Sequence, residues 1–258
     1  EGVQRREEYQ GAYSGLKIPT PAAVIQTGAV RAQALAFLGQ ADVGAATDQA
    51  QSLGLKHLPG ANTIDQIMGA MQSASDAGQP ELAMRWAGAA VVLTDRADLW
   101  ADYAQRLLLL TSDDYQTQRD YDQRGLSAAI NAYLRATGPG EEATALNLLA
   151  QALEAQDRGK QMIPTLRLAI AAQPRPGLQA ALDDAIGKYG FRITDTTVES
   201  DSAAPRICAE FSDPLAQAGV DYETYVRLPS SALVVEADGY QLCVDGVEHG
   251  ERYRITFR

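Results

Sequence analysis

Residues 176–198 read PGLQAALDDAIGKYGFRITDTTV, and this stretch decides the fold because the sequence pattern changes within it. Before Tyr189 the apolar residues recur at intervals of three and four, which is the period of an amphipathic helix. From Phe191 onward β-branched and aromatic residues occur in short alternating runs, which is typical of strands. We therefore predict an α+β chain with a domain boundary at 189–191.

The first part, residues 22–189, is predicted to be an α-helical domain with clusters of Gly and Pro between its helices. Pro164 falls inside one predicted helix, where it is expected to kink the helix or to shift its start. Residues 1–21 have no clear period and are predicted to form a loose N-terminal arm. The predicted helices are 22–38, 62–77, 80–94, 97–110, 124–137, 141–156, 160–172 and 176–188.

The predicted helices also have a repeating pattern. Gly125 and Gly159 are 34 residues apart, and each is expected to open a helix of similar sequence. This spacing resembles tetratricopeptide repeats, in which pairs of antiparallel helices stack at a period of 34 residues. Gly78 stands further from Gly125, so an insertion is expected near residues 112–123. The sequence thus predicts helical hairpins of the tetratricopeptide kind.

Three aromatic residues, Trp86, Trp100 and Tyr103, lie on neighbouring predicted helices. They have two interpretations from the sequence. They either line a concave groove that binds a partner peptide, since aromatic residues often anchor interfaces, or they pack between the helices as large core residues. Packing is the more common role for such residues.

The second part, residues 191–258, is predicted to be an antiparallel β-sandwich of the immunoglobulin-like kind. Ile207, Ala209 and Phe211 alternate with polar residues, as expected of a strand with one buried face. The same alternation runs through Tyr253 to Phe257, where the sequence given stops. We expect the sandwich to be incomplete.

Cys208 and Cys243 lie in two predicted strands of this part. They either form a disulfide between neighbouring strands, which would fit an oxidising compartment, or remain as two buried thiols. A catalytic role is not expected, because neither cysteine has an evident activating base. His57, in the sequence LKHLPG, lacks a second His at metal-ligand spacing and is expected to cap a helix or lie on the surface.

Composition excludes several classes of function. The chain has 258 residues and a formal net charge of −11, which disfavours binding to nucleic acid or to anionic membranes. No apolar run reaches the roughly 18 to 20 residues needed to span a bilayer. With two His, two Cys and four Met, we expect no enzyme, no cofactor and no metal site. The chain begins with Glu1, so any membrane anchor is expected to depend on a segment preceding it.

Residues 208–215, CAEFSDPL, and residues 242–256, LCVDGVEHGERYRIT, carry a family resemblance. Together they resemble the first macroglobulin-type domain of bacterial α2-macroglobulins, over about residues 204–258. The resemblance implies a large periplasmic protease trap, in which cleavage of a bait segment makes the shell close around the protease. Many members also carry a reactive thioester with the motif Cys-x-x-Gln. Neither cysteine of this chain is followed by Gln at that spacing, so the trapping chemistry is not expected here.

These features predict a non-catalytic, protein-binding N-terminal portion of a periplasmic or extracellular α2-macroglobulin-like endopeptidase inhibitor. The partners implied are target proteases, engaged through the full-length parent. The alternative is a free-standing periplasmic adaptor, whose helical repeats bind a protein of the bacterial envelope. The two differ in the parent reading frame, which continues for a long β-rich stretch in the first case and stops near Arg258 in the second.

Overall fold

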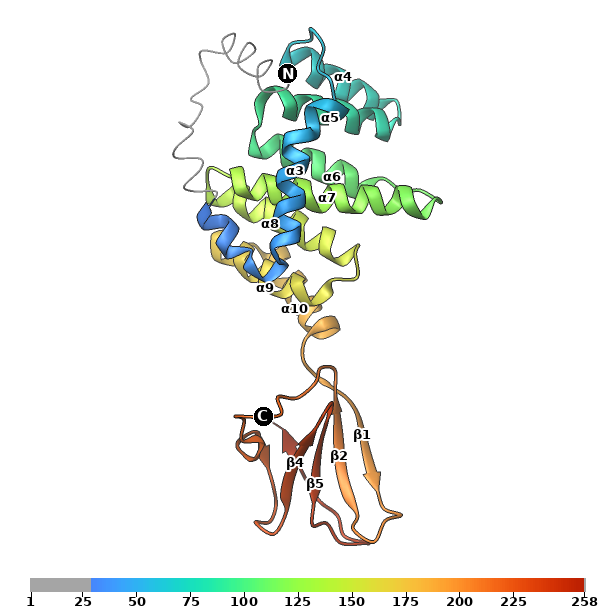
Figure 1. Cartoon of the computed structure of the whole chain (residues 1–258), viewed down its shortest axis with the longest axis vertical. Helices are drawn as coiled ribbons and strands as arrows, with labels where there is room; N and C mark the ends of the chain where they lie inside the picture. Colours follow the sequence, from blue (N-terminus) through green and yellow to red (C-terminus); the bar gives the residue numbers. More distant parts are fainter. Residues whose placement is uncertain (1–28, 258) are drawn as a thin grey trace. The chain divides into compact units, whose positions relative to one another are not determined.

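The computed structural model describes residues 29–257 (Figure 1), so the predicted arm at 1–21 lies outside the described residues. By its internal contacts the chain divides into two compact units, residues 1–188 and residues 189–258. The first unit is helical and the second is built of antiparallel strands, so the prediction of an α+β chain is confirmed. Among the described residues, no helix combines the length and the apolar character needed to cross a membrane.

The helical unit begins its described part with a short helix at residues 29–34 and the 3₁₀ helix η1 (Ala36–Leu38). A run of α-helices follows. They are α3 (Gln40–Lys56), α4 (Ile64–Asp76), α5 (Pro80–Thr94), α6 (Ala97–Leu109), α7 (Tyr115–Arg135), α8 (Pro139–Glu154), α9 (Gly159–Ala172) and α10 (Pro176–Tyr189).

Local signals explain where several of these helices begin. Thr63 and Gln66 form a reciprocal capping box at the start of α4, which satisfies backbone N–H groups that have no partner within the helix. Pro80 and Pro139 stand in the first turns of α5 and α8, where a missing N–H costs little. The Asp114 side chain accepts a hydrogen bond from the Thr117 N–H and caps α7.

The helices pack as consecutive antiparallel neighbours. α4 packs against α5, α6 against α7 and α8 against α9, while α5–α6 and α7–α8 contacts join these pairs (Figure 1). Small residues permit the close approach: a Cβ atom on Gly125 would lie only 2.9 Å from a methyl carbon of Leu108 on α6. Alanine and leucine side chains fill most of the space between the helices. The buried residues include Ala87, Ala90, Leu107, Leu126, Ala129, Ala132, Leu146, Leu149 and Leu153.

Two helical predictions are wrong. The sequence pattern predicts no helix over 40–56, yet α3 occupies this range; its few large apolar residues are too widely spaced to give a clear period. The expectation that Gly125 opens a helix is wrong, because residues 115–123 of the expected insertion form the first half of α7 and Gly125 lies inside that helix. Of the two alternatives expected for Pro164, the shifted helix start does not occur, because α9 begins at Gly159 and continues through the proline.

The β unit contains two antiparallel sheets. The larger sheet has the strand order β1 (Ile193–Glu199), β2 (Arg206–Phe211), β5 (Gln241–Asp245) and β4 (Val234–Asp238). The smaller sheet pairs β3 (Val226–Arg227) with β6 (Thr256–Phe257), and the 3₁₀ helix η2 (Tyr222–Tyr225) precedes β3. The strand expected through Tyr253 to Phe257 is therefore present only over its last residues.

The core of the β unit lies on one face of the larger sheet. Ala209 and Phe211 of β2 and Leu242 of β5 are buried on this face, where Leu215 and Val226 pack against them. A second cluster continues along the unit and consists of Leu233, Val244 and Val247. The prediction that Ala209 and Phe211 share a buried face is thus confirmed, and the hydrophobic contact explains the alternating pattern of β2.

Candidate protein-binding site

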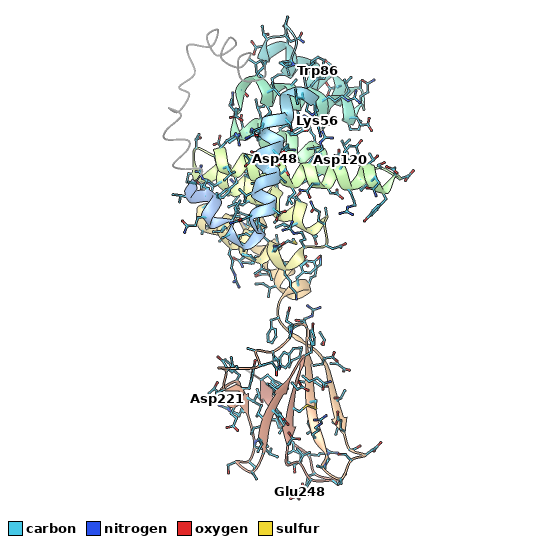
Figure 2. All side chains as sticks on the ribbon, viewed as in Figure 1. Asp48, Lys56, Trp86, Asp120, Asp221 and Glu248 are labelled. Carbon is cyan, nitrogen blue, oxygen red and sulfur yellow. A yellow bond between two sulfur atoms is a disulfide. The ribbon has the colours of Figure 1, made fainter. Side chains whose placement is uncertain are left out.

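Helix α3 lies across the helical hairpins rather than within one of them (Figure 1). Its principal neighbour is α7, and it also contacts α5, while η1 contacts α9. Figure 2 shows Asp48 and Lys56 on this helix. A helix that crosses several hairpins contacts residues far away in the sequence. The surface beneath α3 is therefore formed by residues from different parts of the chain.

Hydrogen bonds from α7 and α9 hold α3 and η1 in place. Asn131 donates to the Ala46 carbonyl at 2.8 Å, and Gln161 donates to the Phe37 carbonyl at 2.9 Å. The Arg158 guanidinium binds both carboxylate oxygens of Asp42, at 2.9 and 2.6 Å. Such bidentate pairs are among the strongest and most orientation-specific polar contacts in proteins.

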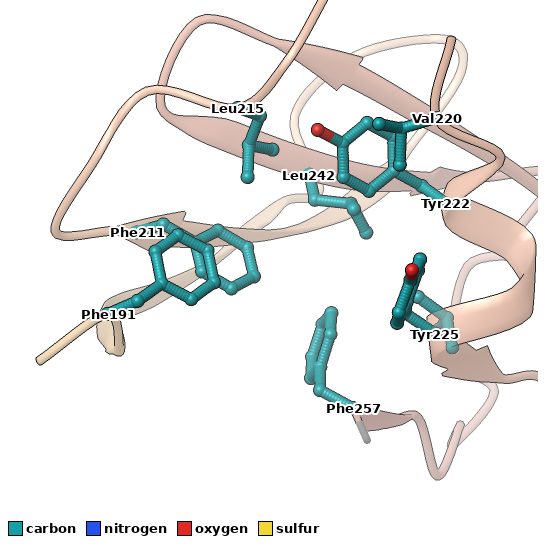
Figure 3. A pocket seen from close by; sticks show the side chains of 9 residues that line it. Phe191, Phe211, Leu215, Val220, Tyr222, Tyr225, Leu242 and Phe257 are labelled. Carbon is teal, nitrogen blue, oxygen red and sulfur yellow. The ribbon is translucent and has the colours of Figure 1, made fainter.

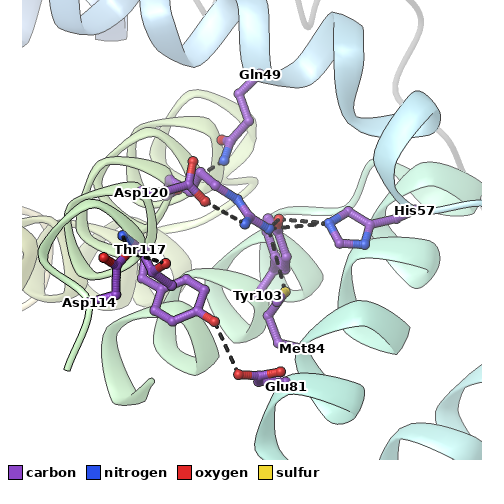
Figure 4. A network of polar contacts seen from close by, with 10 residues as sticks. Gln49, His57, Glu81, Met84, Tyr103, Asp114, Thr117 and Asp120 are labelled. Atoms are coloured by element: carbon purple, nitrogen blue, oxygen red, sulfur yellow. Dashed lines mark hydrogen bonds and ion pairs between the residues drawn. The ribbon is translucent and has the colours of Figure 1, made fainter. Parts of the chain in front are cut away.

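A second polar network lies at the C-terminal end of α3 (Figure 4). Tyr103 of α6 is its centre: its hydroxyl lies 2.9 Å from His57 Nε2 and accepts a hydrogen bond from Arg124 at 2.8 Å. Arg124 also donates to Asp120 at 2.8 Å, and its backbone carbonyl accepts a bond from Gln49 of α3 at 2.9 Å. The network therefore joins α3, α6 and α7.

Burial keeps His57 uncharged within this network. Its side chain is only 6% exposed, and desolvation, reinforced by the charges of Arg124, Lys56 and Arg85, lowers its pKa to about 4. Of the two alternatives from the sequence, His57 is the C-cap residue of α3, with its backbone N–H bonded to the Leu53 carbonyl, whereas a surface position is wrong. Its Nδ1 atom has no hydrogen-bond partner within residues 29–257, so the ring serves as a packed, neutral acceptor or donor for Tyr103.

A cavity of about 200 Å³ opens beside α3 and is bounded by α6 and α7 as well. Charged residues of both signs line it, including Asp48, Lys56 and Arg124, together with the serines Ser52 and Ser127. This mixture of amide, hydroxyl and charged groups can bind a polar side chain of a partner.

The three aromatic residues singled out in the sequence do not form an open groove. Trp100 and Tyr103 are 1% and 0% exposed, and their rings meet edge to face with centroids 6.2 Å apart. Arg135 lies over the Trp100 ring, and the indole N–H of Trp100 donates a hydrogen bond to Asp95. Trp86 is half-buried on α5. Trp100 and Tyr103 thus belong to the packing between helices, although Tyr103 also reaches the cavity beside α3.

The β unit contains an apolar pocket of about 220 Å³ (Figure 3). Phe191 stands at its edge, 60% exposed, and its ring stacks on that of the buried Phe211 with centroids 5.0 Å apart. Tyr225 and Val220 are also partly exposed, at 55% and 41%. The remaining lining residues are Leu215, Tyr222, Val226, Leu242 and Phe257. The interior of this unit is therefore accessible to an apolar group.

Cys208 and Cys243 form a disulfide in the structure. They occupy directly opposite positions on the neighbouring strands β2 and β5, and both are buried. Of the two alternatives that the sequence leaves open, the structure contains the cross-strand bridge. Because both sulfur atoms are engaged, neither is available as a nucleophile or a metal ligand.

Within residues 29–257 no group of three or more His, Cys, Asp or Glu side chains is placed to hold a metal ion. Sequence reasoning missed the residues that hold α3, because Asp42 and Arg158 are distant in the chain and neither belongs to a motif. Comparison of the chain with family models, with curated proteins and with solved structures found no match.

Proposed function

We propose that this chain is a non-catalytic, protein-binding N-terminal portion of an α2-macroglobulin-like endopeptidase inhibitor of the bacterial envelope. One observation carries the proposal: the two stretches that resemble the family lie on neighbouring paired strands. Residues 208–215 begin in β2 and residues 242–256 begin in β5, with Cys208 opposite Cys243. A chance resemblance in two separate segments would not require them to meet in one sheet.

The finer architecture belongs to the same proposal. The larger sheet and the β3–β6 pair have a hydrophobic core between them, which supports a β-sandwich of the macroglobulin kind. The consecutive pairs α4–α5, α6–α7 and α8–α9 support a helical-repeat domain, although their lengths vary. In this proposal the helices supply the protein-binding surface, and the sandwich begins the shell of the inhibitor.

The disulfide supports a location in the periplasm or outside the cell. Disulfides persist in oxidising compartments, whereas cytosolic thiols are kept reduced. The buried position of Cys208 and Cys243 in adjacent strands makes the bridge a structural one.

Protease inhibition by the complete gene product tests the proposal. The product is mixed with trypsin, elastase or subtilisin, and residual activity is measured on casein and on a small peptide anilide. Enclosure of a protease blocks access of a large substrate much more than access of a small one, so casein cleavage should fall at least ten-fold while anilide cleavage persists. Equal activity on both substrates, with and without the product, would refute the inhibitor proposal.

The free-standing envelope adaptor remains the second candidate. The observation that favours it is the polar surface beneath α3, which binds that helix through residues of the helical unit. The length of the parent reading frame separates the two candidates: an inhibitor needs a long continuation of β-rich sequence after Arg258, and an adaptor does not.

A further inference from the structure

Helix α3 is attached to the helical unit differently from its neighbours. Of its 17 residues only Ala46 and Leu53 are buried, whereas the 15 residues of α5 include eight buried ones. Apolar contact therefore contributes little to its attachment, and hydrogen bonds and an ion pair contribute most of the specific contacts. Segments with few buried apolar contacts open more readily than the rest of a domain.

The sequence of α3 also favours release. Gly44 and Gly54 lie inside the helix, where glycine lowers helix propensity, and neither is required there by a positive φ. The flanking glycines are different: Gly39 has a φ of +95° just before the helix, and Gly60 has a φ of +63° in the loop that follows. Glycine turns at both ends give the helix two points about which it can swing.

The surface beneath η1 and α3 consists of Arg124 and Asn131 of α7, Gln161 of α9 and Arg158 at the N-cap of α9, and we name it the α3-facing surface. It carries two arginines in a chain whose formal net charge is −11. Asn131 donates to the backbone carbonyl of Ala46 and Gln161 to that of Phe37, whereas the backbone carbonyl of Arg124 accepts a hydrogen bond from the Gln49 side chain. The first two contacts accept a helix or its preceding turn without requiring one particular side chain.

The residues of α3 that meet this surface have a regular spacing. Asp42, Ala46, Gln49 and Leu53 follow one another at intervals of four, three and four, which places them on one face of the helix. The face carries an acidic residue in the first turn, then small, polar and apolar residues. A negative charge at a helix N-terminus is also favoured by the helix dipole.

We propose that the α3-facing surface is the docking site for an amphipathic helix of a partner protein, and that α3 occupies this site until the partner displaces it. The partner helix carries an acidic residue in its first turn for Arg158, a small residue four positions later and an apolar residue eleven positions later. Charge complementarity with Arg158 and the seated α3 itself specify this kind of ligand. The proposal rests on the proposed protein-binding role, and it holds equally for an inhibitor and an adaptor.

A peptide of residues 40–57 with a fluorescent label tests the site on the full chain. The Asp42→Lys substitution in the chain sets a cation against Arg158 and loosens the internal α3, while the peptide keeps its aspartate. The peptide should bind this variant at least ten-fold more tightly than it binds the wild-type chain. Asp98→Lys is the matched control, because it breaks the exposed pair with Arg96, which has no hydrogen bond to α3. It should leave peptide binding at the wild-type level.

A charge exchange shows whether the peptide occupies the proposed site. A chain with Arg158→Asp alone also loosens the internal α3, because the introduced carboxylate repels Asp42, and it should bind the wild-type peptide at least ten-fold more weakly than the Asp42→Lys chain does. A peptide carrying Asp42→Lys should recover most of that loss. If the wild-type peptide binds both chains equally, it binds elsewhere, and the proposal is wrong.

Hydrogen exchange on the wild-type chain gives a measurement that needs no variant. The amides of α3 should exchange at least ten-fold faster than those of α6, which has a far larger buried fraction. Equal protection of the two helices, or global unfolding of the Asp42→Lys chain, would make α3 a permanent part of the fold and overturn the proposal. An exchange of α3 between two copies of the wild-type chain would show that the site takes a second copy of this chain, and it would overturn the proposed partner helix. The protease assay on the complete gene product is independent of all these outcomes.

Discussion

At the scale of single residues, His57 shows how burial changes the chemistry of a side chain. An exposed His is partly protonated near neutral pH, but this ring is enclosed beside Tyr103 and close to the charges of Arg124 and Lys56. The protonated form would be both desolvated and repelled, so the neutral form is favoured. The free energy of unfolding of the helical unit is thereby linked to pH.

The first prediction concerns this linkage. The pKa of His57 is about 4 in the folded chain and near 6.5 in the unfolded chain, so the unfolded chain takes up the extra proton as the pH falls. Stability is retained above pH 6.5 and is lost between pH 6.5 and pH 4. Between pH 7.5 and pH 4.5 the wild type should lose roughly 2 to 3 kcal/mol more than the His57→Gln variant.

Urea unfolding at the two pH values measures the difference. Because all other ionisable groups are shared, their contributions largely cancel in the comparison with His57→Gln. An equal loss of stability in the two proteins would show that His57 is not the group that carries the linkage.

The second prediction concerns the space beside the His57 ring. A Cβ atom on Gly88 of α5 would lie 2.5 Å from ring carbons of His57, so Gly88→Ala forces the ring or the helix to move. Such overpacking should lower the free energy of unfolding by about 1 to 3 kcal/mol. Gly69→Ala in α4 is the matched control, because nothing lies within 4 Å of its added methyl group.

The control should leave stability unchanged or raise it by about 0.5 to 1 kcal/mol, since alanine is the better helix former. Chemical denaturation of the two variants gives the comparison directly. Similar stabilities for Gly88→Ala and Gly69→Ala would contradict the close packing of His57 against α5.

At the scale of elements, few large apolar contacts stabilise the strands of the β unit. The smaller sheet has only the two short strands β3 and β6, and the pocket lined by Phe191 and Phe211 opens into the core. The larger sheet is linked covalently by Cys208 and Cys243 on its two central strands. We therefore expect the disulfide to contribute a large share of the stability of this unit.

The third prediction follows from the length of the loop that the disulfide closes, a separation of 35 residues. By loss of chain entropy in the unfolded state, the Cys208→Ala/Cys243→Ala double variant should lose about 3 to 4 kcal/mol in the β unit. The helical signal of the other unit should keep its own unfolding midpoint. Circular dichroism follows the helices, and proteolysis of the β unit follows the strands.

Thiol titration of the denatured wild-type chain provides the control. No thiol should react without reductant, and two should react after reduction. Two reactive thiols in the absence of reductant would contradict the bridge.

At the scale of the whole molecule, the net charge affects which surfaces attract or repel the chain. The formal net charge of −11 repels phosphate-rich surfaces, and the cations near α3 are matched by Asp42 and Asp120. We therefore expect protein surfaces with complementary cationic patches to be attracted to the chain more strongly than polyanions are.

The fourth prediction is that the chain does not bind DNA or vesicles rich in phosphatidylglycerol at 0.15 M salt. The formal net charge of −11 gives a long-range repulsion from these polyanions. Gel shift and vesicle co-sedimentation measure both interactions, and vesicles with a cationic lipid serve as the positive control. Salt-sensitive binding to the anionic vesicles would contradict the prediction.

The sequence by itself determined the elements whose signals are local. Helices α4, α5 and α6 fall within a few residues of the predicted ranges because their apolar residues keep a helical period and Pro, Gly or capping residues bound them. The same holds for α8, α9 and α10, and the alternation through Ala209 and Phe211 correctly located a buried strand face.

Only the tertiary structure decided the features that depend on distant contacts. Helix α3 has a weak apolar period and is held by groups such as Arg158, which pairs with Asp42 across more than half of the helical unit. The burial of His57 likewise depends on Gly88 and Tyr103, which no local pattern connects to it. A helix with few buried apolar residues has only a weak apolar period in its own sequence, because the residues that hold it in place lie elsewhere in the chain.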